Sequence, residues 1–148
     1  MKKLNSFSVS FYILLPLIII GAFSCKKSTS DNTVSVNISG NWAGTTTQPA
    51  IAGIQSAETD AFTLSLSQSG TTIAGTFTKG GTSPATGTVS GTINGSNITL
   101  TAVTTSANKG GAILTGAINV GKNAMNGTYS SQSEGTQFQG TWAMTKTN

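Results

Sequence analysis

The sequence predicts an all-β protein, an eight-stranded antiparallel up-and-down barrel that follows an N-terminal signal segment. Beyond about residue 33 no useful helical period occurs, and glycine-bearing turns separate short segments rich in Thr, Ile, Val and aromatic residues. A five-residue phrase also recurs in which a large apolar residue, a glycine and a second large apolar residue occupy alternate positions. Successive side chains of a strand point to opposite faces, so each copy forms one apolar face. The six copies are 38–42, 73–77, 89–93, 114–118, 125–129 and 138–142.

Each predicted strand carries one apolar face. Six strands contain a copy of the phrase, and the second and fifth keep the same alternation without the glycine. Eight such strands joined in sequence favour a closed barrel, because closure removes exposed sheet edges. In chain order the predicted strands are 34–47, 61–68 (Phe62, Leu64, Leu66), 71–78, 86–93, 97–104 (Ile98, Leu100, Ala102), 112–120, 123–130 and 136–146.

Residues 1–24 have the layout of a signal peptide. Lys2 and Lys3 precede an apolar run of about 13 residues, which is shorter than the roughly 20 that span a bilayer as a helix. The run ends at Cys25, the only cysteine of the chain. This ending resembles that of a bacterial lipoprotein, in which cleavage precedes the cysteine and fatty acyl chains such as palmitate are attached to it. The resemblance implies lipidation of Cys25, whereas the alternative is an ordinary secretory signal followed by a stray thiol.

The resemblance also implies a location in the cell envelope, on the outer membrane of a Gram-negative bacterium, with either face of that membrane open. Residues 25–33 are then the lipidated cysteine and a flexible tether, and residues 34–148 form the barrel domain. From Cys25 onward the chain has six lysines and four carboxylates, which gives a net charge of +2. No basic patch indicates a nucleic-acid partner. The membrane is the partner that we expect, and no protein partner is identified.

The predicted connections are unequal at the two ends of the barrel. Those after the second, fourth and sixth strands are short, and Asn94-Gly95 is the best tight-turn signal among them. The connections 48–60, 79–85, 105–111 and 131–135 are longer, and in an up-and-down barrel they share one end, which we call the mouth. The tether joins the opposite end, the base. We therefore expect the mouth to point away from the membrane and to carry the binding residues.

Aromatic residues gather toward the mouth in this arrangement, whereas mainly aliphatic residues fill the base. The pattern predicts a pocket for a small apolar or aromatic ligand, with a partner for the Tyr129 hydroxyl. The alternative is a filled core, because eight strands give an interior that side chains can just fill. The protein would then be a structural or interaction lipoprotein that contacts protein or glycan, and one version is a protease-inhibitor-like barrel that inserts loop 48–60. The candidate ligand-binding residues are Phe62, Phe77, Tyr129 and Phe138, with Trp42 near mid-height.

Three segments resemble the avidin and lipocalin group of calycin-type barrels: Gly40-Asn41-Trp42, Ile73–Phe77 and Phe138–Trp142. The resemblance implies an apolar pocket at the mouth, with loop 48–60 in the position of a lid. It does not extend to biotin binding, because avidins surround biotin with several further tryptophans and this chain has only two. In that group the first-strand tryptophan, here Trp42, more often packs the base of the barrel.

The residues that carry most catalytic and metal chemistry are scarce. The chain has no histidine, and lipidation would use its one cysteine. Glu58 and Asp60 fall in the long predicted loop, where we expect them to be solvated; the alternative is that they bind a calcium ion or a basic partner. We therefore expect no enzymatic activity, no cofactor and no metal site.

Overall fold

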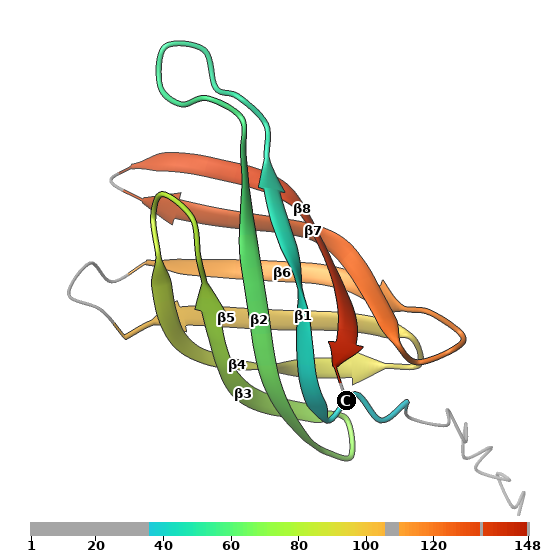
Figure 1. The fold of residues 1–148 in the computed structure, drawn as a ribbon. Coiled ribbons are helices and arrows are strands. Elements are labelled where there is room, and N and C mark those ends of the chain that lie inside the picture. The colour runs from blue at the N-terminus through green and yellow to red at the C-terminus, as the bar shows by residue number, and fades with distance from the viewer. Residues whose placement is uncertain (1–35, 106–109, 134, 148) are drawn as a thin grey trace, which may run out of the picture. The chain divides into compact units, whose positions relative to one another are not determined.

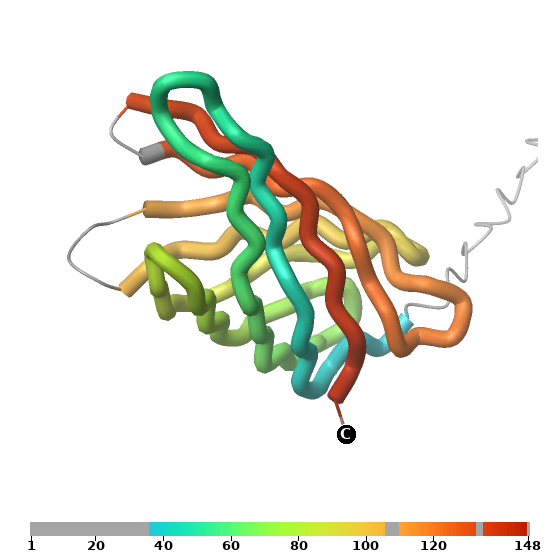
Figure 2. The backbone as a smooth tube through the Cα atoms, turned by 45° about the horizontal axis from the view of Figure 1, so that its top comes forward, coloured from blue at the N-terminus to red at the C-terminus, as the bar shows by residue number. Residues whose placement is uncertain are grey.

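The fold is an antiparallel barrel that closes by pairing its first strand with its last. The computed structural model describes residues 36–147 apart from 106–109 and 134 (Figure 1). Each strand pairs with the next in the chain, and β1 pairs with β8, as Figure 2 shows. The eight-stranded up-and-down barrel that the sequence predicted is thus confirmed. The strands are β1 (Gly40–Gln48), β2 (Glu58–Ser69), β3 (Thr72–Lys79), β4 (Ala85–Asn94), β5 (Asn97–Thr104), β6 (Gly111–Ile118), β7 (Ala124–Ser133) and β8 (Thr136–Thr147).

The predicted signal peptide 1–24, the lipidation site Cys25 and the tether up to residue 33 lie outside the described residues. Within residues 36–105, 110–133 and 135–147, no helix is long and apolar enough to cross a membrane.

Alternate residues of each strand face one continuous apolar core. In β2, for example, Phe62, Leu64 and Leu66 are buried while Thr63 and Ser65 are exposed. At the mid-strand glycines the neighbouring strand or a large ring occupies the place of a side chain. A Cβ added to Gly116 would lie 2.6 Å from Trp142 Cζ2, and one added to Gly87 would lie 2.6 Å from Phe77 Cε1. These glycines therefore allow close packing and do not leave open space.

The base is closed by a segment that the sequence analysis had placed in the first strand. Residues 36–39 are not part of a strand, and β1 begins only at Gly40, where φ is +125°. Ile38 is fully buried, its N–H donates to Gln68 Oε1 (2.8 Å), and its carbonyl accepts from Trp42 Nε1 (2.9 Å). The predicted strand 34–47 was therefore too long. Ile38 is instead buried across the base of the barrel, and its segment ends at Gly40, where the chain changes direction.

Two connection lengths also differ from the prediction. The β6–β7 connection spans residues 119–123, because Asn119 Oδ1 accepts from the N–H groups of Asn123 and Ala124 (3.1 Å each) and organises a wider turn. The β7–β8 connection contains only residues 134 and 135, because the β7–β8 ladder continues through polar residues that had been assigned to a loop. The longer connections 49–57 and 80–84 remain at the mouth, where β5 ends and β6 begins, and Figure 1 shows 49–57 extending beyond it.

Candidate ligand-binding site

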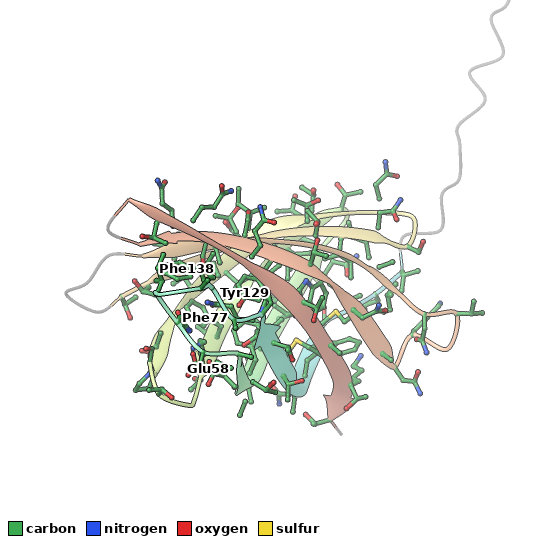
Figure 3. The ribbon with its side chains drawn as sticks, turned by 90° about the horizontal axis from the view of Figure 1, so that it is seen from above. Glu58, Phe77, Tyr129 and Phe138 are labelled. Atoms are coloured by element: carbon green, nitrogen blue, oxygen red, sulfur yellow. The ribbon has the colours of Figure 1, made fainter. Side chains whose placement is uncertain are left out.

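A cavity of about 330 Å³ opens at the mouth of the barrel. It is enclosed by apolar side chains from β2, β3, β6 and β8, with small residues on β5 and β6 and polar groups at its rim. Figure 3 shows Phe77, Tyr129, Phe138 and Glu58 gathered at this end of the barrel. The apolar and small lining residues are Phe62, Phe77, Phe138, Leu114, Ala85, Ala102, Ala112, Gly110 and Gly111, and the polar ones include Thr46, Gln48, Gln55, Glu58, Lys79 and Tyr129.

The empty volume arises from small side chains on neighbouring strands. Ala102 on β5 pairs directly with Ala112 on β6, and both line the cavity. Opposite strands carry large rings: Phe62 and Phe77 lie with ring centroids 5.8 Å apart and planes tilted by 44°. Below this level large side chains such as Trp142 and Met125 fill the interior. The barrel is thus filled toward its base and contains a cavity at its mouth.

The polar wall of the cavity contains a buried amide with an unused donor. The Tyr129 hydroxyl donates to Gln48 Oε1 (3.3 Å), so the partner expected for this hydroxyl comes from β1. Among the described residues, the buried Nε2 of Gln48 has no hydrogen-bond partner. An unpaired buried amide donor costs on the order of 1–3 kcal/mol relative to a paired one. A group that accepts a hydrogen bond from Gln48 would recover this free energy.

The charged residues at the mouth form a fixed cluster. Asp60 is buried and forms an ion pair with Lys79, whose ammonium also donates to the Ser83 carbonyl (3.3 Å). Glu58 accepts from Gln55 Nε2 (3.0 Å) and from the Thr82 N–H (3.2 Å). The assignment to a loop was wrong for both carboxylates, because β2 begins at Glu58. The expected solvation was wrong for Asp60, which is buried, whereas Glu58 is only partly buried.

The pKa values of two groups report on this cluster. The pKa of Glu58 is lowered, chiefly by the hydrogen bonds from Thr82, with a contribution from the charge of Lys79. The pKa of Tyr129 is raised, first by its burial and then by the negative charges of Asp60 and Glu58. The Glu58 carboxyl is therefore ionised at neutral pH, and the Tyr129 hydroxyl remains a neutral donor.

The structure brings together four of the five residues proposed from the sequence to bind ligand: Phe62, Phe77, Tyr129 and Phe138 all line the cavity. Trp42 does not line it. Its ring is buried at the base, where Nε1 donates to the Ile38 carbonyl. Lys146 Nζ lies 5.7 Å from the centroid of the Trp42 ring. Sequence reasoning missed Gln48 and the Ala102–Ala112 pair. The inward face of β1 includes Gln48, but only the register with β8 and β7 places its amide near Tyr129.

The described residues contain no group of three His, Cys, Asp or Glu side chains that would hold a metal ion.

Comparison with solved structures identifies barrels of the same architecture. A redesigned β-barrel, b11L5F_LGL, superposes with a TM-score of 0.58 at 11% sequence identity over 75% of this chain and 92% of its own. A second redesigned β-barrel, mFAP1, bound to DFHBI, superposes with a TM-score of 0.56 at 15% identity over 74% of this chain and 94% of its own. No protein-family model and no curated protein matches the chain. At these identities the likeness establishes the all-β, eight-stranded barrel fold.

Proposed function

We propose that this protein is a binding module that takes one small, flat, largely apolar ligand into the cavity at its mouth. The observation that carries the proposal is the combination of an aromatic-walled cavity with Gln48, a lining residue whose buried Nε2 has no hydrogen-bond partner among the described residues. Small-molecule sites are mostly apolar concavities with a few polar groups that fix the orientation of the ligand. One of the similar barrels is described as bound to a small molecule, DFHBI, which supports the proposal by analogy of fold.

The size of the cavity limits the ligand. Its volume of about 330 Å³ is at the lower end of the roughly 300–1,000 Å³ of small-molecule sites. We therefore expect one aromatic ring or two fused rings, placed against Phe62, Phe77 and Phe138. A hydrogen-bond acceptor on the ligand would pair with Gln48.

A thermal-shift screen tests the proposal directly. Residues 26–148, which include the whole compact unit 32–148, are screened against one- and two-ring aromatic compounds. A ligand at a hundred times its dissociation constant adds roughly 2.7 kcal/mol, which raises the melting temperature by several degrees for a domain of this size. Absence of any shift across such a set would count against a ligand-binding cavity.

A matched pair of substitutions locates the binding. Ala112→Leu adds the same atoms inside the cavity that Ala74→Leu adds on the outer face of β3. We expect the Ala112 variant to lose the ligand-induced shift and the Ala74 variant to keep it. A shift that survives in the Ala112 variant would place the ligand elsewhere.

We also propose that the module is held at the outer membrane of the cell envelope by acyl chains on Cys25. The signal-like residues 1–24 and the single cysteine that ends them support this. Metabolic labelling with an alkynyl fatty acid should mark the protein, and Cys25→Ser should remove both the label and the membrane association. Label that persists in this variant would contradict lipidation at Cys25.

A second candidate function is contact with a protein through the connection 49–57. Its tip side chain, Ile54, is 62% exposed, and a backbone bridge between Ile51 and Gln55 gives the segment a defined shape. Ile54→Asp should then abolish capture of that partner, for example inhibition of a protease, and leave binding of small ligands unchanged. Unchanged capture in this variant would exclude the role.

A further inference from the structure

We propose that the cavity selects cationic aromatic ligands, an arylalkylammonium or a related group, with the Glu58 carboxylate as the counter-ion of the ligand. This inference rests on the proposed function and names the chemical class that the same cavity takes. Three observations carry it: the charge balance of the rim, the engagement of the only described lysine at the mouth, and the aromatic walls next to Glu58.

The described part of the rim carries an excess of negative charge. Glu58 and Asp60 face a single cation, Lys79. The other lysines that the structure describes, Lys122 and Lys146, belong to the β6–β7 connection and the end of β8, at the base. The described charges at the rim therefore leave one net negative charge. The pKa of Tyr129, raised first by burial and then by the charges of Asp60 and Glu58, agrees with this sign.

Lys79 is poorly placed to receive an anionic ligand. Its ammonium is paired with Asp60 and donates to the Ser83 carbonyl (3.3 Å). Gly81 lies directly against Asp60: a Cβ added at Gly81 would overlap the Asp60 carboxylate. An anion that recruited Lys79 would leave Asp60 buried without its counter-ion, which is costly in a low-dielectric site.

Glu58 has the opposite properties. It lines the cavity, and its carboxylate accepts hydrogen bonds from Gln55 Nε2 (3.0 Å) and from the Thr82 N–H (3.2 Å). An ionised carboxylate has about four acceptor positions, and Glu58 is only partly buried, so an ammonium group can approach it. The two existing bonds fix the carboxylate in place. A ligand ammonium at Glu58 would leave its ring among Phe62, Phe77 and Phe138, whose faces also attract cations.

The test uses three probes that share one aromatic body and differ in charge: 1-naphthylmethylamine, 1-naphthalenemethanol and 1-naphthaleneacetate. Their dissociation constants for residues 26–148 are measured by calorimetry at pH 7 and low ionic strength. An exposed ion pair together with cation–π contacts predicts that the amine binds about tenfold more tightly than the alcohol. The carboxylate should bind more weakly than the alcohol, and added salt should reduce both differences.

Glu58→Gln should reduce the advantage of the amine over the alcohol from about tenfold to about twofold. Asp31→Asn, which makes the same change of charge before the barrel in the sequence, should leave the ratio of amine to alcohol unchanged. An equal or lower affinity for the amine than for the alcohol would overturn the inference, as would an amine preference that stays at about tenfold in Glu58→Gln.

Binding of the three probes distinguishes the cationic ligand class from the proposed binding function. Binding of the alcohol or the carboxylate without a preference for the amine would refute the cationic class and keep the cavity as a binding site. Failure of all three probes to bind, in a cavity large enough for each of them, would refute both.

Discussion

The ring of Tyr129 on β7 lies against Gly140 on β8, at a position where a Cβ on Gly140 would be 2.6 Å from Tyr129 Cε1. The two residues are direct partners in the β7–β8 ladder. Because no side chain stands between them, the tyrosine ring passes over β8 and its hydroxyl reaches Gln48 on β1. A glycine of the repeated phrase thus fixes the polar wall of the cavity.

Gly140→Ala should therefore destabilise the barrel and disturb the cavity together. The added methyl group meets the tyrosine ring and also the backbone oxygen of Thr47, and such overpacking typically costs about 1–3 kcal/mol. Urea denaturation gives the change in unfolding free energy. Gly110→Ala is the matched control, because no atom of the described residues lies within 4 Å of its new Cβ. Equal unfolding free energies of the two variants would show that the close approach at Gly140 does not affect stability.

The ionisation of Tyr129 can be measured without interference, because the chain has two tyrosines and the other, Tyr12, precedes residue 26. Absorbance titration of residues 26–148 should give a pKa above the ordinary value of 10.0. Glu58→Gln should lower that pKa by removing a negative charge, while burial keeps it above the ordinary value. A tyrosine pKa that does not respond to Glu58 would show that the carboxylate does not act on the cavity.

The same shift has a consequence for stability at alkaline pH. The raised pKa means that the folded protein favours the neutral phenol, so this contribution is complete below pH 10 and is lost as the pH rises through the folded-state value. The unfolding free energy of the unmodified chain should fall more steeply in this range than that of Tyr129→Phe. Parallel curves for the two proteins would contradict the shift.

Ile38 and Ile54 provide a matched test of whether residues 36–39 close the base of the barrel. Ile38 is fully buried under the barrel, whereas Ile54 is 62% exposed at the mouth. Ile38→Ala should cost about 2–5 kcal/mol of unfolding free energy, as for other buried aliphatic truncations. Ile54→Ala should change it by less than about 0.5 kcal/mol. Similar small effects in both variants would mean that residues 36–39 do not close the core.

The Asp60–Lys79 pair should stabilise the mouth. The side chains of Lys79 and Asp60 are 25% and 5% exposed, so Asp60→Asn leaves a lysine that can turn to water. We expect a loss of roughly 1–3 kcal/mol, below the about 3–5 kcal/mol of a fully buried pair. Glu58→Gln, the same change two residues earlier, should leave the unfolding free energy close to that of the unmodified chain. A smaller loss for Asp60→Asn than for Glu58→Gln would contradict the burial of the pair.

Much of the architecture was predictable because it depends on local periodicity. Alternating apolar residues such as Phe62, Leu64 and Leu66 specify which face of a strand is buried, and turn residues such as Gly95 specify where a strand ends. Errors occurred where polar residues continue a ladder, as at the end of β7, and where an apolar residue is buried without belonging to a strand, as at Ile38. In both places pairing partners distant in sequence decide the conformation.

The candidate site was predictable only in part, for the same reason. Phe62, Phe77, Tyr129 and Phe138 could be assigned to the mouth, because strand direction and position along the strand determine height in an up-and-down barrel. The register between strands decides which side chains are neighbours, and a residue's partner on the next strand could not be identified from the local sequence pattern. It alone pairs Ala102 with Ala112 to open the cavity.

The sequence by itself therefore determined the barrel, the inward face of each strand and the gathering of aromatic residues at the mouth, since all of these follow from a period of two and from chain order. The tertiary structure decided that the mouth is hollow, that Gln48 meets Tyr129 and that Asp60 meets Lys79. These outcomes depend on contacts between strands, whose free energy is fixed only when the barrel closes.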